Sequence, residues 1–290
     1  MRRILLVLAL LFAASAAHAQ INVGLEIKRR TFLRYEPLLV TVTMENLTGR
    51  DIMLSDGEAP WFSFLVMHGE QKTILPPRNP DYKLDPLELK IGETLKRTVN
   101  LVDLYPITEY GLHRVRATIY AKPLNQFFTS RTAGVDISEG RTLWKQTVGV
   151  PETMPNAGDN HEFSLLSTQG SQHQYLYCRV TDPGSGRVMG MYKLGHLIDG
   201  TMFDAKFDAT NTLHVLHLIG PKTYSLTQIS PNGEVHGQWT YDAPKYKPML
   251  RRDGTGNLDI VGATKRVEAA KNLPPPPKAS DRPPGLPPAR

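Results

Sequence analysis

The stretch of sequence that decides the fold is YEPLLVTVTMENLTG, residues 35–49. Within it, Val40, Val42 and Met44 alternate with threonine and glutamate, so that every second side chain is apolar. Successive side chains of a β-strand point to opposite faces of a sheet, and this period of two therefore predicts a strand with one buried and one solvated face. The NLTG sequence at 46–49 predicts the turn that ends the strand.

The same alternation recurs along the first half of the chain, whereas amphipathic helical periodicity is almost absent. In residues 112–121, for example, the apolar set is Val115, Ala117 and Ile119. Strands are predicted in this half at residues 21–29, 38–46, 51–54, 61–68, 71–75, 94–101, 112–121 and 141–149. Turn sequences separate these segments, and their spacing is typical of a β-sandwich.

Two motifs carry a resemblance to a known fold family. Residues 35–49 resemble the opening strand of bacterial immunoglobulin-like sandwiches, and the sequences LVDLY (101–105) and YGLHRVRA (110–117) resemble their later strand. The resemblance covers residues 20–149 and implies a sandwich domain of that family. At His113 the family pattern has tyrosine, so the resemblance implies no tyrosine-corner hydrogen bond here. Such modules serve adhesins, surface enzymes, inhibitors and chaperones alike, so no single function is implied.

The second half of the chain contains an internal repeat. Residues 208–216 align with 253–261 at a spacing of 45, and residues 175–188 align more loosely with 224–235. A period of about 45 with a strand, a tight turn and a strand is typical of a four-stranded propeller blade. A closed propeller needs at least four blades, whereas 161–263 hold two and a fragment. We therefore expect a second β domain of blade-like antiparallel hairpins. Packing as a sandwich is favoured over a partial propeller completed by another chain, because open blade edges aggregate.

The termini and the linker complete the expected domain organisation. Residues 1–19 have a positive start, an apolar run and an Ala-His-Ala site, which predict a cleavable signal peptide and therefore export. Residues 150–160 contain two prolines and a glycine and are predicted to link the 20–149 sandwich to the second domain. Residues 264–290 are predicted to be a disordered, basic, proline-rich tail. We expect a periplasmic or secreted protein with no membrane span after cleavage.

The basic excess of the chain lies at its two ends. Of the net charge of +6, residues 1–19 contribute +2 and residues 264–290 contribute +4, which leaves residues 20–263 neutral. A protein that binds nucleic acid needs basic charge gathered on one face. The charge distribution therefore excludes nucleic-acid binding as the expected function.

Sequence motifs for catalysis and for metal binding are absent. The chain has no G-x-S-x-G, H-E-x-x-H, C-x-x-C or glycine-rich phosphate loop. His214 and His217 are three residues apart, which places them on opposite faces of a strand and makes joint ligation of a metal unfavourable. Cys178 is the only cysteine, and its apolar neighbours predict a buried thiol. No catalytic, cofactor-binding or metal-binding residue is therefore predicted.

One loop of the second half has the spacing of a calcium site. It places oxygen side chains at alternate positions, namely Asp253, Thr255, Asn257 and Asp259. The acid that such a loop needs at its twelfth position is replaced by Thr264. Turn chemistry accounts for the same residue types, so calcium is considered and disfavoured.

Aromatic side chains give the candidate recognition surface. Adjacent residues of a strand face opposite ways, so one of Phe127 and Phe128 must point outward, whereas Trp239 and Tyr241 must share a face. Trp61 begins a predicted strand and is the fifth candidate. For each residue taken singly, burial in the core is the commoner role.

The sequence thus predicts an exported, all-β, two-domain protein that binds a protein or glycan partner at the cell envelope and is not an enzyme. Two alternatives stay open. One is an inhibitor or partner of an extracytoplasmic protease, with the proline-rich loop 76–93 as its contact. The other is a hydrolase with its site between the domains. The sequence predicts neither the ligand nor the oligomeric state.

Overall fold

The computed structural model describes residues 20–80, 82–154, 156–168, 174–198, 203–243 and 245–266. This part of the chain is nearly all β and forms several antiparallel sheets, as expected. Helical turns in it are limited to α2 (Leu101–Leu104) and η1 (Lys122–Leu124). The predicted signal peptide, and the proline-rich residues from 267 onward, lie outside the described residues.

The chain divides into two compact units, and their boundary differs from the expected one. The first unit contains residues up to Arg30 and Pro37–Ile137, and the second contains Thr31–Glu36 and the residues from Ser138 onward. Residue 149 was the expected end of the first domain. The difference arises because alternation identifies a strand but not its partner, and the last expected strand of the first domain pairs within the second unit.

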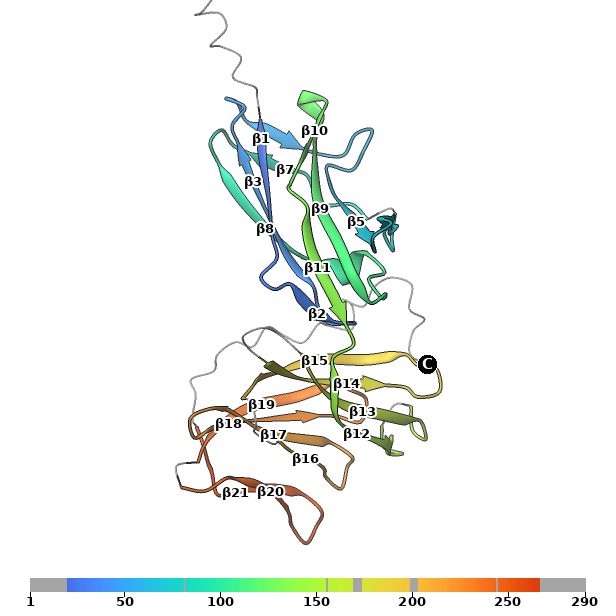
Figure 1. Ribbon diagram of the computed structural model, residues 1–290, viewed down its shortest axis with the longest axis vertical. Helices are drawn as coiled ribbons and strands as arrows, with labels where there is room; N and C mark the ends of the chain where they lie inside the picture. The colour runs from blue at the N-terminus through green and yellow to red at the C-terminus, as the bar shows by residue number, and fades with distance from the viewer. Residues whose placement is uncertain are drawn as a thin grey trace, which may run out of the picture. The chain divides into compact units, whose positions relative to one another are not determined.

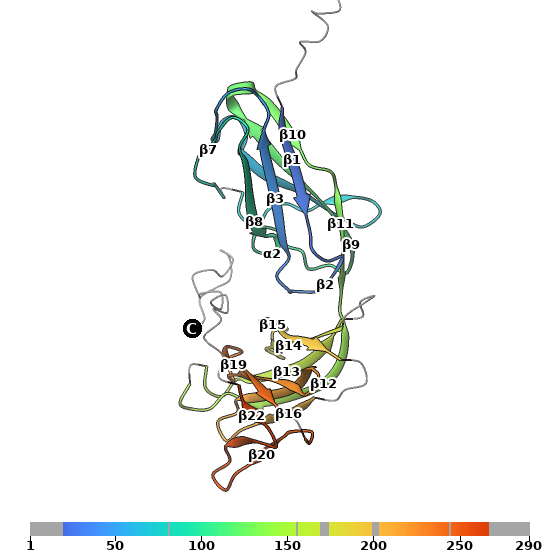
Figure 2. The ribbon, with the colours of Figure 1, turned by 90° about the vertical axis from the view of Figure 1, so that its left-hand side faces the viewer.

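The first unit contains three sheets. One has the order β1 (Ile21–Glu26), β3 (Leu39–Asn46) and β8 (Thr94–Asn100). Another contains β11 (Ala133–Ser138), β9 (Gly111–Ala121), β5 (Phe62–His68) and β6 (Thr73–Ile74), with β10 (Gln126–Thr129) also paired to β9. The third is the pair β4 (Ile52–Leu54) and β7 (Leu87–Leu89). Figures 1 and 2 show the sheet of β1, β3 and β8 facing the sheet that contains β9 and β11.

The core of the first unit follows the alternation that the sequence shows. Val40, Val42 and Met44 of β3 are fully buried, and the intervening threonines are half-exposed. On β9 the buried residues include Val115, Ala117 and Ile119. Each fully buried Val, Ile or Met side chain among them contributes about 1.5–3 kcal/mol to the stability of the unit.

Asn46 ends β3 and fastens the turn that follows. Its side-chain Nδ2 donates to the backbone oxygens of Arg50 and Leu89, each at 2.8 Å, while its Oδ1 accepts from the backbone N–H of Thr48 at 3.0 Å. Asn46 is completely buried, and these bonds supply partners for both ends of its amide. The NLTG sequence therefore fixes both the turn and the approach of β7.

A buried tyrosine, the last residue of the LVDLY motif, is hydrogen-bonded within the same unit. The Tyr105 hydroxyl, just after α2, donates to the backbone oxygen of Phe64 at 2.6 Å. Burial raises the pKa of Tyr105. His113 is itself buried and contacts the Gly111 carbonyl oxygen through Nδ1 at 3.1 Å. Residue 105 thus ties the region after α2 to β5.

The second unit is built from two sheets in which each strand neighbours the next along the chain, except that β22 follows β19. The first has the order β12 (Arg141–Gly149), β13 (Asn160–Ser167), β14 (Gln174–Thr181) and β15 (Val188–Leu197). The second has the order β16 (Asp204–Phe207), β17 (Leu213–Gly220), β18 (Thr223–Ile229), β19 (Val235–Asp242) and β22 (Thr264–Lys265). A separate hairpin pairs β20 (Met249–Arg252) with β21 (Leu258–Val261). The expected linker, 150–160, forms the connection between β12 and β13.

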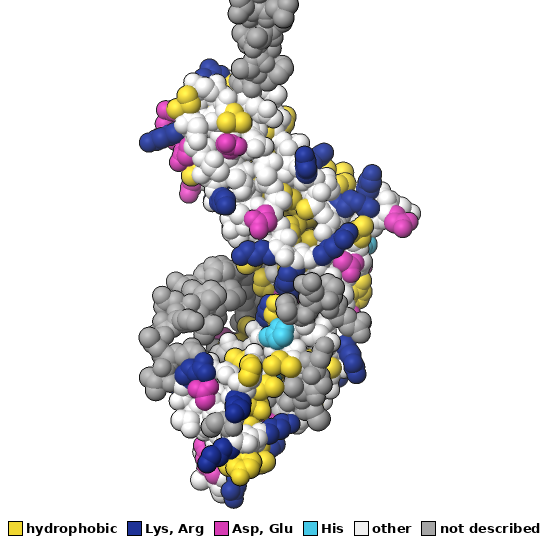
Figure 3. Space-filling view, turned by 60° about the vertical axis from the view of Figure 1, so that its left-hand side comes forward, with side chains coloured by type: hydrophobic (Ala, Val, Ile, Leu, Met, Phe, Trp, Pro, Cys, Tyr) yellow, Lys and Arg dark blue, Asp and Glu magenta, His cyan; other side chains and the backbone are white. Residues whose placement is uncertain are grey.

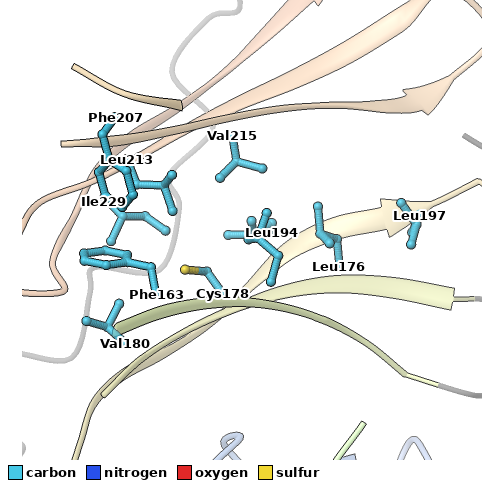
Figure 4. Close-up of a cluster of buried hydrophobic side chains, with 11 residues drawn as sticks. Phe163, Leu176, Cys178, Val180, Leu194, Leu197, Phe207, Leu213, Val215 and Ile229 are labelled. Atoms are coloured by element: carbon cyan, nitrogen blue, oxygen red, sulfur yellow. The ribbon is translucent and has the colours of Figure 1, made fainter. Parts of the chain in front are cut away.

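The core of this unit lies between its two sheets (Figure 4). Phe163, Cys178 and Val180 of the first sheet are fully buried against Leu213 and Ile229 of the second. The thiol of Cys178 is completely buried, and burial raises its pKa. Cys178 therefore has the packing role that its apolar neighbours predict.

The outer face of the first sheet is covered by β2 (Thr31–Leu33) and the residues up to Glu36. Leu33 packs against Leu166 and Tyr177. The buried carboxyl group of Glu36 accepts a hydrogen bond from the Tyr177 hydroxyl at 2.8 Å. Gly140 permits the close approach: its φ is +78°, and an added Cβ would lie 2.7 Å from Leu33 Cδ2.

Candidate binding surface

Trp61 does not belong to the candidate surface, contrary to expectation. Its side chain is 0% exposed, and its indole Nε1 donates to the backbone oxygen of Leu84 at 3.2 Å. Phe62 packs beside it. The aromatic ring of Trp61 is therefore part of the interior of the first unit, just before β5 and under the loop that carries Leu84.

The pair at the end of the first unit divides as the alternation predicts. On β10, Phe127 is 56% exposed, whereas Phe128 is 7% exposed and therefore does not contribute to a surface. The ring of Phe127 lies 4.7 Å from that of Tyr120, whose hydroxyl donates to Asn125 Oδ1 at 3.0 Å. One exposed ring backed by a fixed tyrosine makes a small patch.

The larger aromatic surface lies in the second unit. Trp239 and Tyr241 share the outer face of the sheet that contains β19, and both are half-buried. Cross-strand pairing sets Tyr224 of β18 directly opposite Tyr241, and Leu226 opposite Trp239. We call Tyr224, Trp239 and Tyr241 the aromatic strip.

Tyr224 was not among the residues expected from the sequence. Its alternation with Leu226 in β18 was the available signal, and it places both on one face of that strand. Alternation gives no register, however, so it does not reveal that Tyr224 faces Tyr241. The pairing of β18 with β19 supplies this information.

Gly237 holds the ring of Trp239 down on the sheet. A Cβ atom on Gly237 would lie 2.5 Å from two carbon atoms of that ring, Cη2 and Cζ2. Residues 237 and 239 are two apart on one strand and share a face, so only glycine leaves room for the indole to lie over the backbone. A side chain at position 237 would therefore displace the indole from this place.

The β20–β21 hairpin covers only one side of the outer face. Leu250 of β20 is buried against Leu216 and Leu226. Two residues of β16 bind the backbone of Leu250. Its N–H donates to the Asp204 carboxylate at 2.8 Å, and its oxygen accepts from the Lys206 ammonium at 2.6 Å. The hairpin thus lies against β16 and β17, while the aromatic strip on β18 and β19 keeps part of its surface exposed.

Basic side chains border the aromatic strip. The Nζ of Lys265 on β22 lies 4.7 Å from the centroid of the Trp239 ring, within the range of a cation–π contact. Arg266 forms an exposed ion pair with Asp242. Figure 3 shows hydrophobic side chains gathered on one face of this unit with Lys and Arg side chains beside them. Such a surface suits a partner that offers apolar or ring surface for stacking.

The histidines of β17 lie on opposite faces, as their spacing predicts. His214 contacts Asp208 Oδ2 through Nε2 at 2.9 Å. His217 faces Gly195 of the other sheet, and a Cβ atom on that glycine would lie 3.0 Å from His217 Nε2. Both ring nitrogens of His217 are buried without a hydrogen-bond partner. Burial lowers the pKa of His217 to about 4.

The repeated aspartates lie in similar turns of two hairpins, β16–β17 and β20–β21. Asp208 Oδ1 accepts bonds from the N–H and hydroxyl of Thr210, at 2.8 and 2.7 Å. Asp253 Oδ1 accepts the same two bonds from Thr255 at the same distances, and a third from the N–H of Asn257. These bonds lower the pKa of Asp253. Turn formation thus accounts for the aspartate and threonine at these positions.

Across residues 20–266, apart from the short gaps named above, no three His, Cys, Asp or Glu side chains gather as metal ligands would. In the same residues no helix has the length and apolar character needed to cross a bilayer.

The loop expected to contact a protease is tied to the first unit. In its described residues, the backbone N–H of Arg78 donates to the Leu104 oxygen at 2.7 Å. The Arg78 Nε donates to the oxygens of Val102 and Tyr105, at 3.2 and 3.3 Å. The loop therefore packs over the region of α2 at this point.

No family model, curated protein or solved structure matches this chain. The function must therefore be inferred from the geometry of the chain itself.

Proposed function

We propose that this protein is an exported, non-enzymatic binding protein of the cell envelope, which captures a protein or glycan partner on the aromatic strip. In this proposal the first unit is an immunoglobulin-like sandwich, and the second is a pair of blade-like sheets. The resemblance of residues 35–49 and 101–117 supports the first assignment. The repeated turns at Asp208 and Asp253 support the second. Export rests on the signal-peptide pattern of residues 1–19.

The observation that carries the proposal is the half-exposed aromatic strip. Three aromatic side chains lie together on two paired strands, and the ring of one of them lies over a glycine. Fixed aromatic rings bind at low entropic cost, because few torsions are lost on contact. They stack on sugar rings and on apolar peptide side chains, while the tyrosine hydroxyls and the indole N–H can supply hydrogen bonds.

The test is a binding screen with matched surface variants. The chain from Gln20 is immobilised and exposed to envelope glycans and to envelope proteins. The ligand it retains is then measured against Tyr241→Ala and Tyr224→Ala. Tyr246→Ala is the control, because Tyr246 is 78% exposed and lies outside the strip. We expect at least a tenfold loss of affinity in the two strip variants and no change in the control.

Two results would contradict the proposal. A ligand whose affinity is unchanged by both strip variants would place recognition elsewhere. Turnover of an ester, glycan or peptide substrate that a single polar substitution abolishes would make the protein an enzyme.

A further inference from the structure

The aromatic strip marks the part of a sheet face that the next hairpin leaves uncovered. The first sheet of the second unit packs against the second through a core drawn from strands of both. The next hairpin, β20–β21, instead has β20 on β16 and β17, and its Leu250 packs on Leu216 and Leu226. Among the described residues, β20 and β21 pair only with each other. Tyr224, Trp239 and Tyr241 pack at the margin of this cluster and are only half-buried, so part of each ring stays exposed beside the hairpin.

The chain leaves the described structure at the border of this half-covered face. Lys265 pairs with Tyr241, and the N–H of Arg266 donates to the Thr240 oxygen at 2.8 Å. The next residues of the chain therefore start beside β19, directly at the aromatic strip. Seven residues separate Arg266 from Pro274. At full extension they reach about 28 Å, several times the spacing of about 4.8 Å between adjacent strands.

The sequence that follows suits an aromatic surface and not a sheet edge. Residues 274–277 are four consecutive prolines, and four more prolines follow at 283–288. Proline has no backbone N–H, so these residues cannot pair as a further strand. Proline-rich segments favour the polyproline II conformation, which docks on grooves lined with aromatic rings at little entropic cost. Its free carbonyl oxygens accept hydrogen bonds from tyrosine hydroxyls and from the indole N–H.

We propose that the chain's own residues 274–277 dock on the aromatic strip and cover it. The docking needs no external partner, so it stands apart from the proposed function. A tether of this length gives an effective concentration on the order of 1 mM. A segment that binds in trans with a Kd of about 0.1 mM would therefore be docked in about nine chains of ten. A partner must displace the tail, which lowers its apparent affinity about tenfold.

Charge does not drive this docking. Lys265 and Arg266 border the strip, and residues 267–290 carry more basic than acidic side chains. Like charges do not attract, so apolar stacking must supply the affinity. Docking should accordingly persist at high salt, where attraction between exposed charges would be screened.

The experiment is fluorine NMR on the chain from Gln20 to Arg290, labelled with fluorotryptophan. Trp61, Trp144 and Trp239 are the three tryptophans, and Trp239→Phe assigns the third signal. The test variant replaces Pro274, Pro275, Pro276 and Pro277 with serine. The matched control replaces Pro283, Pro284, Pro287 and Pro288 with serine. We expect the test variant alone to shift the Trp239 signal, in low and high salt. The Trp61 and Trp144 signals report that the folded units are unchanged.

A peptide added in trans completes the design. A synthetic peptide of residues 270–280, added to the test variant, should restore the original Trp239 signal with a Kd of about 0.1 mM. An unchanged Trp239 signal in the test variant overturns the proposal, as does a shift in the control variant alone. A signal that moves on dilution of the unmodified chain also overturns it, because the occupant would then be a second copy.

Discussion

At the scale of single residues, His217 is a buried titratable side chain whose charged form the interior disfavours. Its imidazole lies between the sheets of the second unit, and neither ring nitrogen has a hydrogen-bond partner. Burial holds its pKa down to about 4, whereas an unfolded chain has a histidine pKa of about 6.5. The neutral form is thus the only one that this interior accepts.

The first prediction follows from the sign of that shift. Above about pH 6.5 His217 is neutral in both the folded and the unfolded chain, so its titration does not lower the free energy of unfolding. As the pH falls toward 4, the unfolded chain takes up a proton that the folded chain excludes, so the free energy of unfolding falls by up to about 3 kcal/mol. His217→Leu should flatten this part of the profile in urea titrations between pH 7 and 4. Replacing the exposed His236 with leucine is the control, and equal slopes for both variants would refute the explanation.

The second prediction compares the two repeated aspartates. The Asp208 carboxylate accepts hydrogen bonds within its own turn and also contacts the buried His214. The Asp253 carboxylate accepts hydrogen bonds within its own turn alone. Asp208→Ala leaves the imidazole of His214 without this partner, which should lower the free energy of unfolding by about 1–3 kcal/mol. Asp253→Ala should lower the melting temperature less. Thermal unfolding of both variants decides the order, and a larger effect at Asp253 would contradict it.

At the scale of elements, the β20–β21 hairpin depends on one side chain. Leu250 is buried in the cluster with Leu216 and Leu226, and its neighbour Met249 on the opposite face is 57% exposed. Leu250→Ala should therefore cost about 2–5 kcal/mol, and Met249→Ala should be nearly neutral. Amide hydrogen exchange should show faster exchange of residues 249–261 in the first variant only. Equal protection in both variants would mean that the hairpin is held by its backbone bonds to β16.

The strands were predictable, and their partners were not. The alternation is regular along β3 and along β9 up to Ile119, because one face of each strand is buried and the other is partly exposed. β12 alternates as well, but nothing local in the sequence distinguishes pairing with β13 from pairing with the first unit. The same limit applies to the aromatic strip. The sequence shows that its three residues are aromatic, but the pairing of Tyr224 with Tyr241 depends on the strand register.

At the scale of the whole molecule, the second unit is assembled from two separate parts of the chain. Thr31–Glu36 belongs to it, although the residues on either side belong to the first unit. No periodic pattern reveals such a short inserted segment, and its effect arises only through the contacts of Leu33 and Glu36 with Tyr177 and its neighbours. The sequence alone therefore predicts two units without predicting that they share segments in this way.

The fourth prediction tests this sharing. A chain that begins at Ser138 lacks the cover of its first sheet and should expose Leu166 and Tyr177. We expect it to bind a hydrophobic dye and to unfold at lower urea than the same unit in the full chain. A peptide of residues 29–38 should reverse both effects, and the same peptide with Glu36→Gln should do so less well. A fragment as stable as the full chain, without the peptide, would show that the cover contributes nothing.

The cover of the first sheet also sets an order of events during synthesis. Glu36 and its partner Tyr177 are 141 residues apart along the chain. At a synthesis rate of about 5–20 residues per second, about 7–28 s pass between the synthesis of residues 31–36 and that of the strand that they cover. In that interval Leu33 has no native site, and the strands on both sides of it can already pair. Residues 31–36 are therefore synthesised before the rest of the second unit. That unit is complete only when this early segment has packed on its first sheet.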